Sequence, residues 1–129
     1  RSSDLSMKVF VKEPGKGIIE KEITEGLETL QGLVDGYIEQ VSYIRKFSNN
    51  DITMLVNEEG LINELEPNIV ILEGREVVSV LFGTVVFIGA RAMDDEFSSI
   101  TKEQEKIIKC ELIEGYSLVG GELVSVIQM

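Results

Sequence analysis

The chain has 129 residues, of which 43% are hydrophobic and 27% are charged, as is typical of a single soluble globular domain. Its 23 acidic and 12 basic residues give a formal net charge of −11, which argues against direct binding to nucleic acid or to an anionic membrane surface, since both need clustered cations. Histidine is absent and cysteine occurs once, so the sequence excludes Ser-His-Asp and Cys-His catalysis and nearly all zinc sites.

The N-terminal region predicts a hairpin of two strands. Residues 1–6 precede Met7 and are interpreted as a remnant of cloning, which leaves a single α+β domain over 7–129. The segment MKVFVK (7–12) alternates apolar residues with lysine and predicts a strand with one buried face. After a Pro-Gly turn, IIEKEI (18–23) predicts a second strand, antiparallel to the first.

The next segment predicts a short helix followed by a strand. Thr24 is expected to cap the start of the helix, leucines recur at helical spacing after it, and the pair Asp35-Gly36 is expected to end it. The segment YIEQVSYI (37–44) follows at once and predicts a strand.

The middle of the chain predicts an acidic hairpin. DITMLVN (51–57) predicts a strand, NEEG (57–60) predicts a tight turn in which Gly60 takes positive φ, and LINEL (61–65) predicts the return strand. Pro67 lacks a backbone donor and restricts the residue before it, so we expect the return strand to end there.

The segment from 68 to 90 is strongly apolar. It could form a strand and a short helix closed by Gly83, with TVVFIGA (84–90) then a buried strand. The apolar run is too continuous for its periodicity to distinguish helix from strand. Its longest apolar stretch, 77–90, is shorter than the roughly 20 residues that span a bilayer, so we expect it to lie in the core and not in a membrane.

A second helix is predicted near the C-terminus, over SSITKEQEKIIKCEL (98–112). Thr101 and Gln104 form a capping-box pattern at its start, and Glu105 and Lys109 form an i,i+4 ion pair. The apolar residues of the segment share one face, as they do in a helix that packs against a core.

The last segment, YSLVGGELVSV (116–126), places Gly-Gly between two alternating runs and predicts another hairpin. The order of predicted elements then defines the fold class. It predicts an α+β fold, with a mainly antiparallel mixed sheet and two helices packed beside it.

The acidic residues are unevenly distributed along the chain. From Phe47 to Gly74 there are six acidic residues and neither Lys nor Arg. A hairpin in this segment would present negative charge without local neutralisation, and such a surface could occupy the cationic nucleic-acid channel of a partner. The expected partner-binding residues are Glu58, Glu59, Glu64 and Glu66.

The acidic segments lack the spacing of a metal site. NEEGLINELE (57–66) does not match the D-x-[DN]-x-[DN]-G pattern of a calcium loop, and Leu61 and Ile62 fall where ligands would continue. The run Asp94-Asp95-Glu96 is interpreted as an exposed loop before the second helix. We therefore expect no bound metal and no cofactor.

A third of the positive charge lies on the first predicted hairpin. This basic face is the one place where the sequence would tolerate an anionic ligand, and Tyr37 or Tyr43 could supply a contact to a base. The candidate anion-binding residues are Lys8, Lys12, Lys16 and Lys21.

Four segments of the chain carry a family resemblance: MKVFVKEPGK, LETLQGLVDGYIEQV, MLVNEEGLINELEPN and FGTVVFIGA. From Met7 to Ala90 the chain resembles a family of small proteins of unknown function that are carried by phages and mobile elements of Firmicutes and gut bacteria. It has Asp35-Gly36 where that family has Gly-Gly, and Glu66-Pro67-Asn68 where the family has Pro-Pro-Asn. The resemblance implies that some relatives block host defence nucleases, including CRISPR effectors, and it transfers no catalytic residue.

The leading hypothesis is a non-catalytic protein that binds and inhibits a basic host protein, a CRISPR or other defence nuclease, in the cytoplasm of the host cell. The lone Cys110 is interpreted as a packing residue and fits this reducing compartment. The alternative is a small-ligand binder, a homo-oligomer that sequesters a nucleotide-type defence signal on its lysine-bearing hairpin. Neither hypothesis involves direct binding to nucleic acid or to a membrane.

Overall fold

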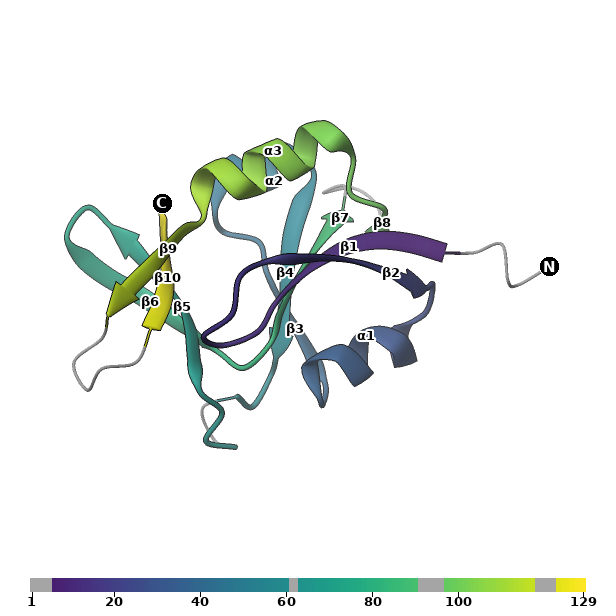
Figure 1. Cartoon of the computed structure of the whole chain (residues 1–129), viewed down its shortest axis with the longest axis horizontal. Helices are drawn as coiled ribbons and strands as arrows, with labels where there is room; N and C mark the ends of the chain where they lie inside the picture. The colour runs from purple at the N-terminus through teal and green to yellow at the C-terminus, as the bar shows by residue number, and fades with distance from the viewer. Residues whose placement is uncertain (1–5, 61–62, 91–96, 118–122) are drawn as a thin grey trace.

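The computed structural model describes residues 6–60, 63–90, 97–117 and 123–129 of the chain (Figure 1). These residues form ten strands and three helices. In chain order they are β1 (Ser6–Lys12), β2 (Ile19–Thr24), α1 (Leu27–Val34), β3 (Ile38–Val41), α2 (Arg45–Ser48), β4 (Ile52–Asn57), β5 (Pro67–Glu73), β6 (Glu76–Phe82), β7 (Val85–Ala90), β8 (Phe97–Ser98), α3 (Lys102–Glu111), β9 (Ile113–Ser117) and β10 (Leu123–Gln128).

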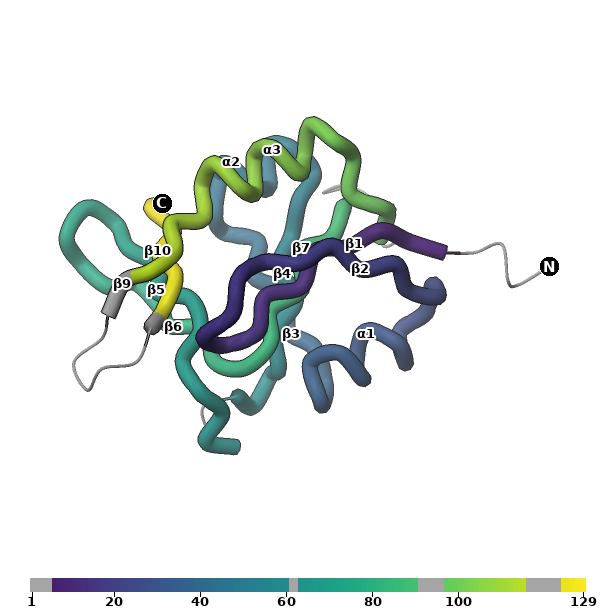
Figure 2. The backbone as a smooth tube through the Cα atoms, in the orientation of Figure 1, coloured from purple at the N-terminus to yellow at the C-terminus, as the bar shows by residue number. Residues whose placement is uncertain are grey.

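The strands divide between two sheets. The larger sheet has the order β2-β1-β7-β4-β3, with β8 beside β7, and all of its neighbours are antiparallel. The smaller sheet has the order β6-β5-β10-β9 and is mixed, because β5 and β10 run parallel. Figure 2 shows the smaller sheet beside the larger one, on the left of the view. The predicted α+β class is confirmed, with the strands in two sheets.

Helices cover both faces of the larger sheet: α2 and α3 lie on one face and α1 lies on the other (Figure 1). The main core lies between this sheet, α2, α3 and the smaller sheet, and it includes Phe47 and Phe87, whose rings meet edge to face at 5.9 Å. The second core lies under α1 and includes Leu30, Val34 and Val86. Because both faces are covered, the central strands β4 and β7 are buried along almost their whole length.

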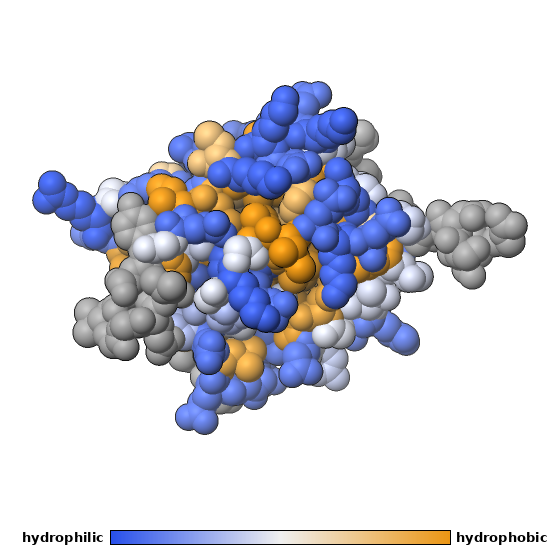
Figure 3. Space-filling view, in the orientation of Figure 1, coloured by the Kyte–Doolittle hydropathy of each residue, from blue (hydrophilic) through white to orange (hydrophobic). Residues whose placement is uncertain are grey.

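The seam between α3 and the β1–β2 hairpin is apolar, with hydrophilic residues along α3 beside it (Figure 3). Ile18, just before β2, and Ile107 of α3 pack partly buried against the main core. In α3, Glu105 Oε2 accepts a hydrogen bond from Lys109 Nζ at 2.8 Å. Glu105 Oε1 lies 3.9 Å from Nζ of Lys8 in β1. The hydrogen bond from Lys109 lowers the pKa of the Glu105 carboxyl group.

A buried lysine and a buried asparagine join the two sheets. Lys12 of β1 and Asn68 of β5 are 2% and 0% exposed. Lys12 Nζ donates to Asn68 Oδ1 at 3.0 Å and to the backbone oxygen of Glu13 at 3.1 Å, while Asn68 Nδ2 donates to the backbone oxygens of Lys12 at 2.7 Å and Gly83 at 2.8 Å. We call this set the Lys12–Asn68 junction. Burial lowers the pKa of Lys12, against the attraction of the Glu114 carboxylate.

The prediction of one buried face for the first strand is wrong. Phe10 faces the main core and Val9 faces the second core, because β1 lies inside the larger sheet with helices on both sides. Lys12, which was expected on an exposed face, is therefore buried.

Several predicted elements are confirmed. The first two strands are β1 and β2, and the strand expected over 51–57 is β4. The helix expected over 98–112 is α3, where Gln104 N donates to Thr101 Oγ1 at 3.1 Å and Thr101 N donates to Gln104 Oε1 at 2.9 Å. The strands of the last hairpin are β9 and β10, and their Gly-Gly turn lies outside the described residues.

The predicted cap of the first helix is wrong. Thr24 is the last residue of β2, and Gly26 is the N-cap of α1 with no side-chain hydrogen bond. The end of the helix at Asp35 is confirmed, and Asp35 takes a left-handed φ of 61°. The strand expected to continue to residue 44 ends at Val41, because Ile44 instead enters the main core at the start of α2.

The helix predicted before Gly83 is also wrong, because this segment forms β6 and pairs antiparallel with β5. Gly74 lies between the two strands with a φ of 65°, and Gly83 follows β6 with a φ of 80°. These are left-handed values that glycine adopts without strain. Pro67 begins β5 rather than ending a strand, a position where a missing backbone donor is tolerated.

Replacing Asn68 by alanine tests the junction. We expect Asn68→Ala to lower the free energy of unfolding by about 2–4 kcal/mol, because it removes an acceptor from a buried ammonium group and the shared donor of two buried backbone oxygens. Urea denaturation followed by circular dichroism measures the change. The control is Asn63→Ala at an exposed position, where we expect a change within about 0.5 kcal/mol. Equal effects of the two variants would contradict the role of Asn68.

Candidate protein-binding surface

The chain crosses from the larger sheet to the smaller one in residues 58–66, which we call the acidic connection. The structure describes all of it except 61–62. The prediction of a return strand over 61–65 is wrong for the part that the structure describes. Asn63 and Glu64 form a turn, in which Asn63 N donates to the backbone oxygen of Glu59 at 2.8 Å. Both sides of β4 are already paired, with β3 and with β7, and the next described strand, β5, belongs to the other sheet. The four carboxylates predicted for partner binding are exposed: Glu58, Glu59, Glu64 and Glu66.

The buried side chain of Asn57 holds the first end of the acidic connection. Its Oδ1 accepts a hydrogen bond from Glu59 N at 2.7 Å, and its Nδ2 donates to the backbone oxygens of Val34 and Asp35, both at 3.0 Å. Glu58 N donates to the Tyr37 oxygen at 2.9 Å. These hydrogen bonds therefore hold Glu58 and Glu59 against the end of α1 and against Tyr37, the residue before β3.

The second end of the acidic connection is held against the end of β6. Gly83 N donates to the Glu66 oxygen at 2.8 Å, and Leu65 packs over Gly83. At Gly60 a Cβ atom would lie 3.0 Å from the Phe82 backbone oxygen, so the absence of a side chain permits this close approach. The positive φ predicted for Gly60 falls instead on Glu64, at 56°.

A groove of about 290 Å³ lies beside the acidic connection, between the two sheets. One wall is β3, the edge of the larger sheet, with Glu39 and Val41, and the other is β6, the edge of the smaller sheet, with Val80 and Phe82. Glu58 also lines the groove. The sequence pattern does not predict this groove, because a helix was expected where β6 lies, although the β-branched residues of EVVSVLF favour a strand.

The groove combines carboxylates with an apolar and aromatic lining. Glu39 and Glu58 supply negative charge, and Tyr43 and Phe82 supply aromatic rings. Among the described residues that line it there is neither Lys nor Arg. Such a lining suits a long cationic side chain, whose methylene groups pack against apolar atoms while its head reaches a carboxylate.

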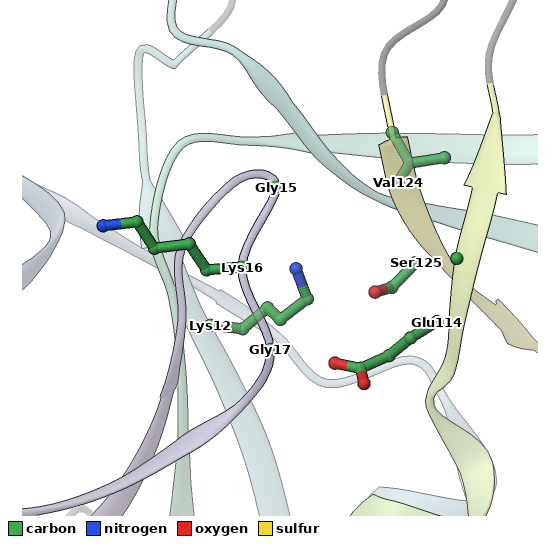
Figure 4. A pocket seen from close by; sticks show the side chains of 8 residues that line it. Lys12, Gly15, Lys16, Gly17, Glu114, Val124 and Ser125 are labelled. Atoms are coloured by element: carbon green, nitrogen blue, oxygen red, sulfur yellow. The ribbon is translucent and has the colours of Figure 1, made fainter.

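The four lysines predicted to bind an anion do not lie together. Lys12 and Lys16 border a cavity of about 130 Å³, where Figure 4 shows Lys12 pointing inward and Lys16 pointing away. Lys8 lies near Glu105 of α3, and Lys21 is exposed on the opposite face of the hairpin, paired with Val9. Lys12 already donates to two acceptors within the Lys12–Asn68 junction.

Other predicted contacts lie apart from this cavity. Tyr37 is 70% exposed, and Tyr43 lines the groove rather than the lysine cavity. Cys110 is exposed on α3, so its interpretation as a packing residue is wrong. The Asp94-Asp95-Glu96 run lies outside the described residues.

The described residues contain neither a metal-binding cluster nor a membrane-spanning helix. In the described ranges no group of three or more acidic or cysteine side chains could hold a metal ion. No helix within those ranges is both long and apolar enough to cross a membrane.

The fold and this surface define a small α+β protein with an acidic face beside a groove between two sheet edges. A family model described as a domain of unknown function (DUF3846) matches residues 7–117, which is most of the chain, so the chain belongs to that family. The match extends beyond Ala90, where the resemblance found in the sequence stopped. Comparison with curated proteins and with solved structures found no match.

The close approach of Gly36 to Asn57 gives a test of how the acidic connection is held. A Cβ at Gly36 would lie 2.7 Å from Asn57 Nδ2, an atom fixed by two hydrogen bonds. We expect Gly36→Ala to lower the free energy of unfolding by about 1–3 kcal/mol. Thermal unfolding measures the change.

The matched control is Gly32→Ala within α1, where nothing lies within 4 Å of the added atom. Alanine at this helical position should raise the free energy of unfolding by about 0.5–1 kcal/mol. Changes of the same sign in the two variants would contradict the account of Asn57.

Proposed function

We propose that this protein is a non-catalytic binding protein that uses the acidic connection and the adjoining groove to capture and inhibit a basic partner protein. One observation carries the proposal: four exposed carboxylates lie on a short connection that is anchored at both ends. The sequence around them, from Phe47 to Gly74, has six acidic residues and no basic residue to neutralise them.

The anchoring matters because it holds the backbone that carries Glu58, Glu59 and Glu66 in place before a partner arrives. A surface that is already ordered loses less conformational entropy on binding than a flexible segment does. The net charge of −11 adds long-range attraction for a cationic surface, which raises the rate of association. These features support binding to a basic partner.

A host defence nuclease, such as a CRISPR effector, has the chemistry expected of the partner. Proteins that hold nucleic acid do so with clustered Lys and Arg, and an acidic protein competes for such a channel. The resemblance to phage and mobile-element proteins supports this choice. In this proposal the protein acts in the cytoplasm of the host cell.

The alternative of a nucleotide-type ligand receives less support from the geometry. The cavity beside Lys12 and Lys16 has a volume of about 130 Å³, whereas pockets for small molecules and cofactors usually have about 300–1,000 Å³. Glu114 also lines this cavity and would oppose an anion. The acidic surface is therefore the stronger candidate.

Charge reversal of the acidic connection tests the proposed function. We expect the variant with Glu58, Glu59, Glu64 and Glu66 all replaced by lysine to lose inhibition, because each contact with a cationic partner becomes repulsive. The measurement is DNA cleavage by a panel of purified CRISPR and other defence nucleases, with wild type and variant compared at equal concentration. Inhibition by wild type should weaken as salt rises from about 0.05 to 0.3 M.

The matched control reverses four exposed acidic residues elsewhere: Glu20, Glu22, Glu25 and Glu28. It produces the same change in net charge on β2, α1 and the turn between them, and we expect it to retain most of the inhibition. Equal loss in both variants would show that only net charge matters. Full inhibition by the first variant would remove the acidic connection from the mechanism.

A further inference from the structure

The strand β6 is an edge strand with an apolar sequence. It is the first strand in the order of the smaller sheet, with β5 as its one neighbour there. Val77 and Val78 are 60% and 45% exposed, and after Glu76 the strand carries no charge. An exposed edge of this kind presents backbone donors and acceptors to which another extended chain can pair.

The regular part of this edge lies at the groove. The pairing of β5 with β6 shifts register at two places, between Val77 and Ser79 and between Leu81 and Phe82, whereas Ser79, Val80 and Leu81 between them pair in unbroken register with β5. These three residues line the groove. A segment added to the edge at this point would therefore place its side chains beside the carboxylates and aromatic rings of the groove.

We propose that an extended, arginine-containing segment of the partner pairs with β6 as an additional strand and places an arginine in the groove between β3 and β6. This proposal rests on the proposed function and specifies how the partner is bound. The guanidinium group meets Glu39 or Glu58 and stacks on Tyr43 or Phe82, and its methylene groups pack against Val80.

Charge complementarity selects this occupant over a second copy of the chain. Two copies would each bring a net charge of −11, and each would bring its own Glu39 and Glu58 to a contact made at this groove. A cationic strand has the opposite charge and supplies the alternating side chains that an edge strand can bind.

The experiment uses a defined probe, a fluorescein-labelled six-residue peptide that alternates arginine and valine, and fluorescence anisotropy at about 50 mM salt. A second peptide of the same sequence is N-methylated at alternate residues, which removes the donors of one edge. The groove variant combines Glu39→Gln with Glu58→Gln. The matched control variant combines Glu28→Gln with Glu103→Gln, two exposed positions outside the groove.

We expect the unmethylated peptide to bind wild type, and N-methylation and the groove variant each to weaken binding by about tenfold. The control variant should bind like wild type. Absence of binding, equal affinity for both peptides, or equal losses in both protein variants would each overturn the proposal.

The same assay separates this proposal from the proposed function. If both peptides bind equally but the lysine variant of Glu58, Glu59, Glu64 and Glu66 binds neither, the acidic surface captures cations without strand pairing. If that lysine variant binds the peptides as well as wild type does, the proposed function itself fails.

Discussion

The hydrogen bonds between Lys12 and Asn68 determine where the two sheets meet. A buried ammonium group is unfavourable unless acceptors surround it, so this pair holds β5 against the end of β1. From the junction the sheets share the main core, while their edge strands β3 and β6 border the groove. The acidic connection spans the same two sheets. The arrangement of the proposed binding surface therefore follows from the junction.

The acidic connection carries charge that does not help the protein to fold. Unneutralised carboxylates repel one another and lower the stability of the folded state. The two buried cores offset that repulsion, and the hydrogen bonds of Asn57 and Gly83 hold the ends of the connection in place. Within the described residues these carboxylates form no ion pair with Lys or Arg. Charge on an anchored backbone, left without an internal partner in this part of the chain, suits a surface for binding a cationic partner.

Local patterns in the sequence were sufficient for part of the fold. The capping box of Thr101 and the strand over 51–57 depend on neighbouring residues alone, and both were predicted. The return strand predicted over 61–65 was wrong for the described residues 63–65, because a hairpin and a crossing between sheets begin with the same turn residues. The Lys12–Asn68 pair was missed because its members lie 56 positions apart. The exposed glutamates were predicted from composition, whereas the groove depends on long-range packing.

The most direct test of the central claim is hydrogen–deuterium exchange of the protein with and without a nuclease that it inhibits. Binding through the acidic connection and the β6 edge should slow exchange in residues 58–60, 63–66 and 76–82. Exchange in α3 and in β9 should stay unchanged. Protection confined to α3, or to the hairpin that carries Lys12 and Lys16, with none at 58–66 or 76–82, would contradict it.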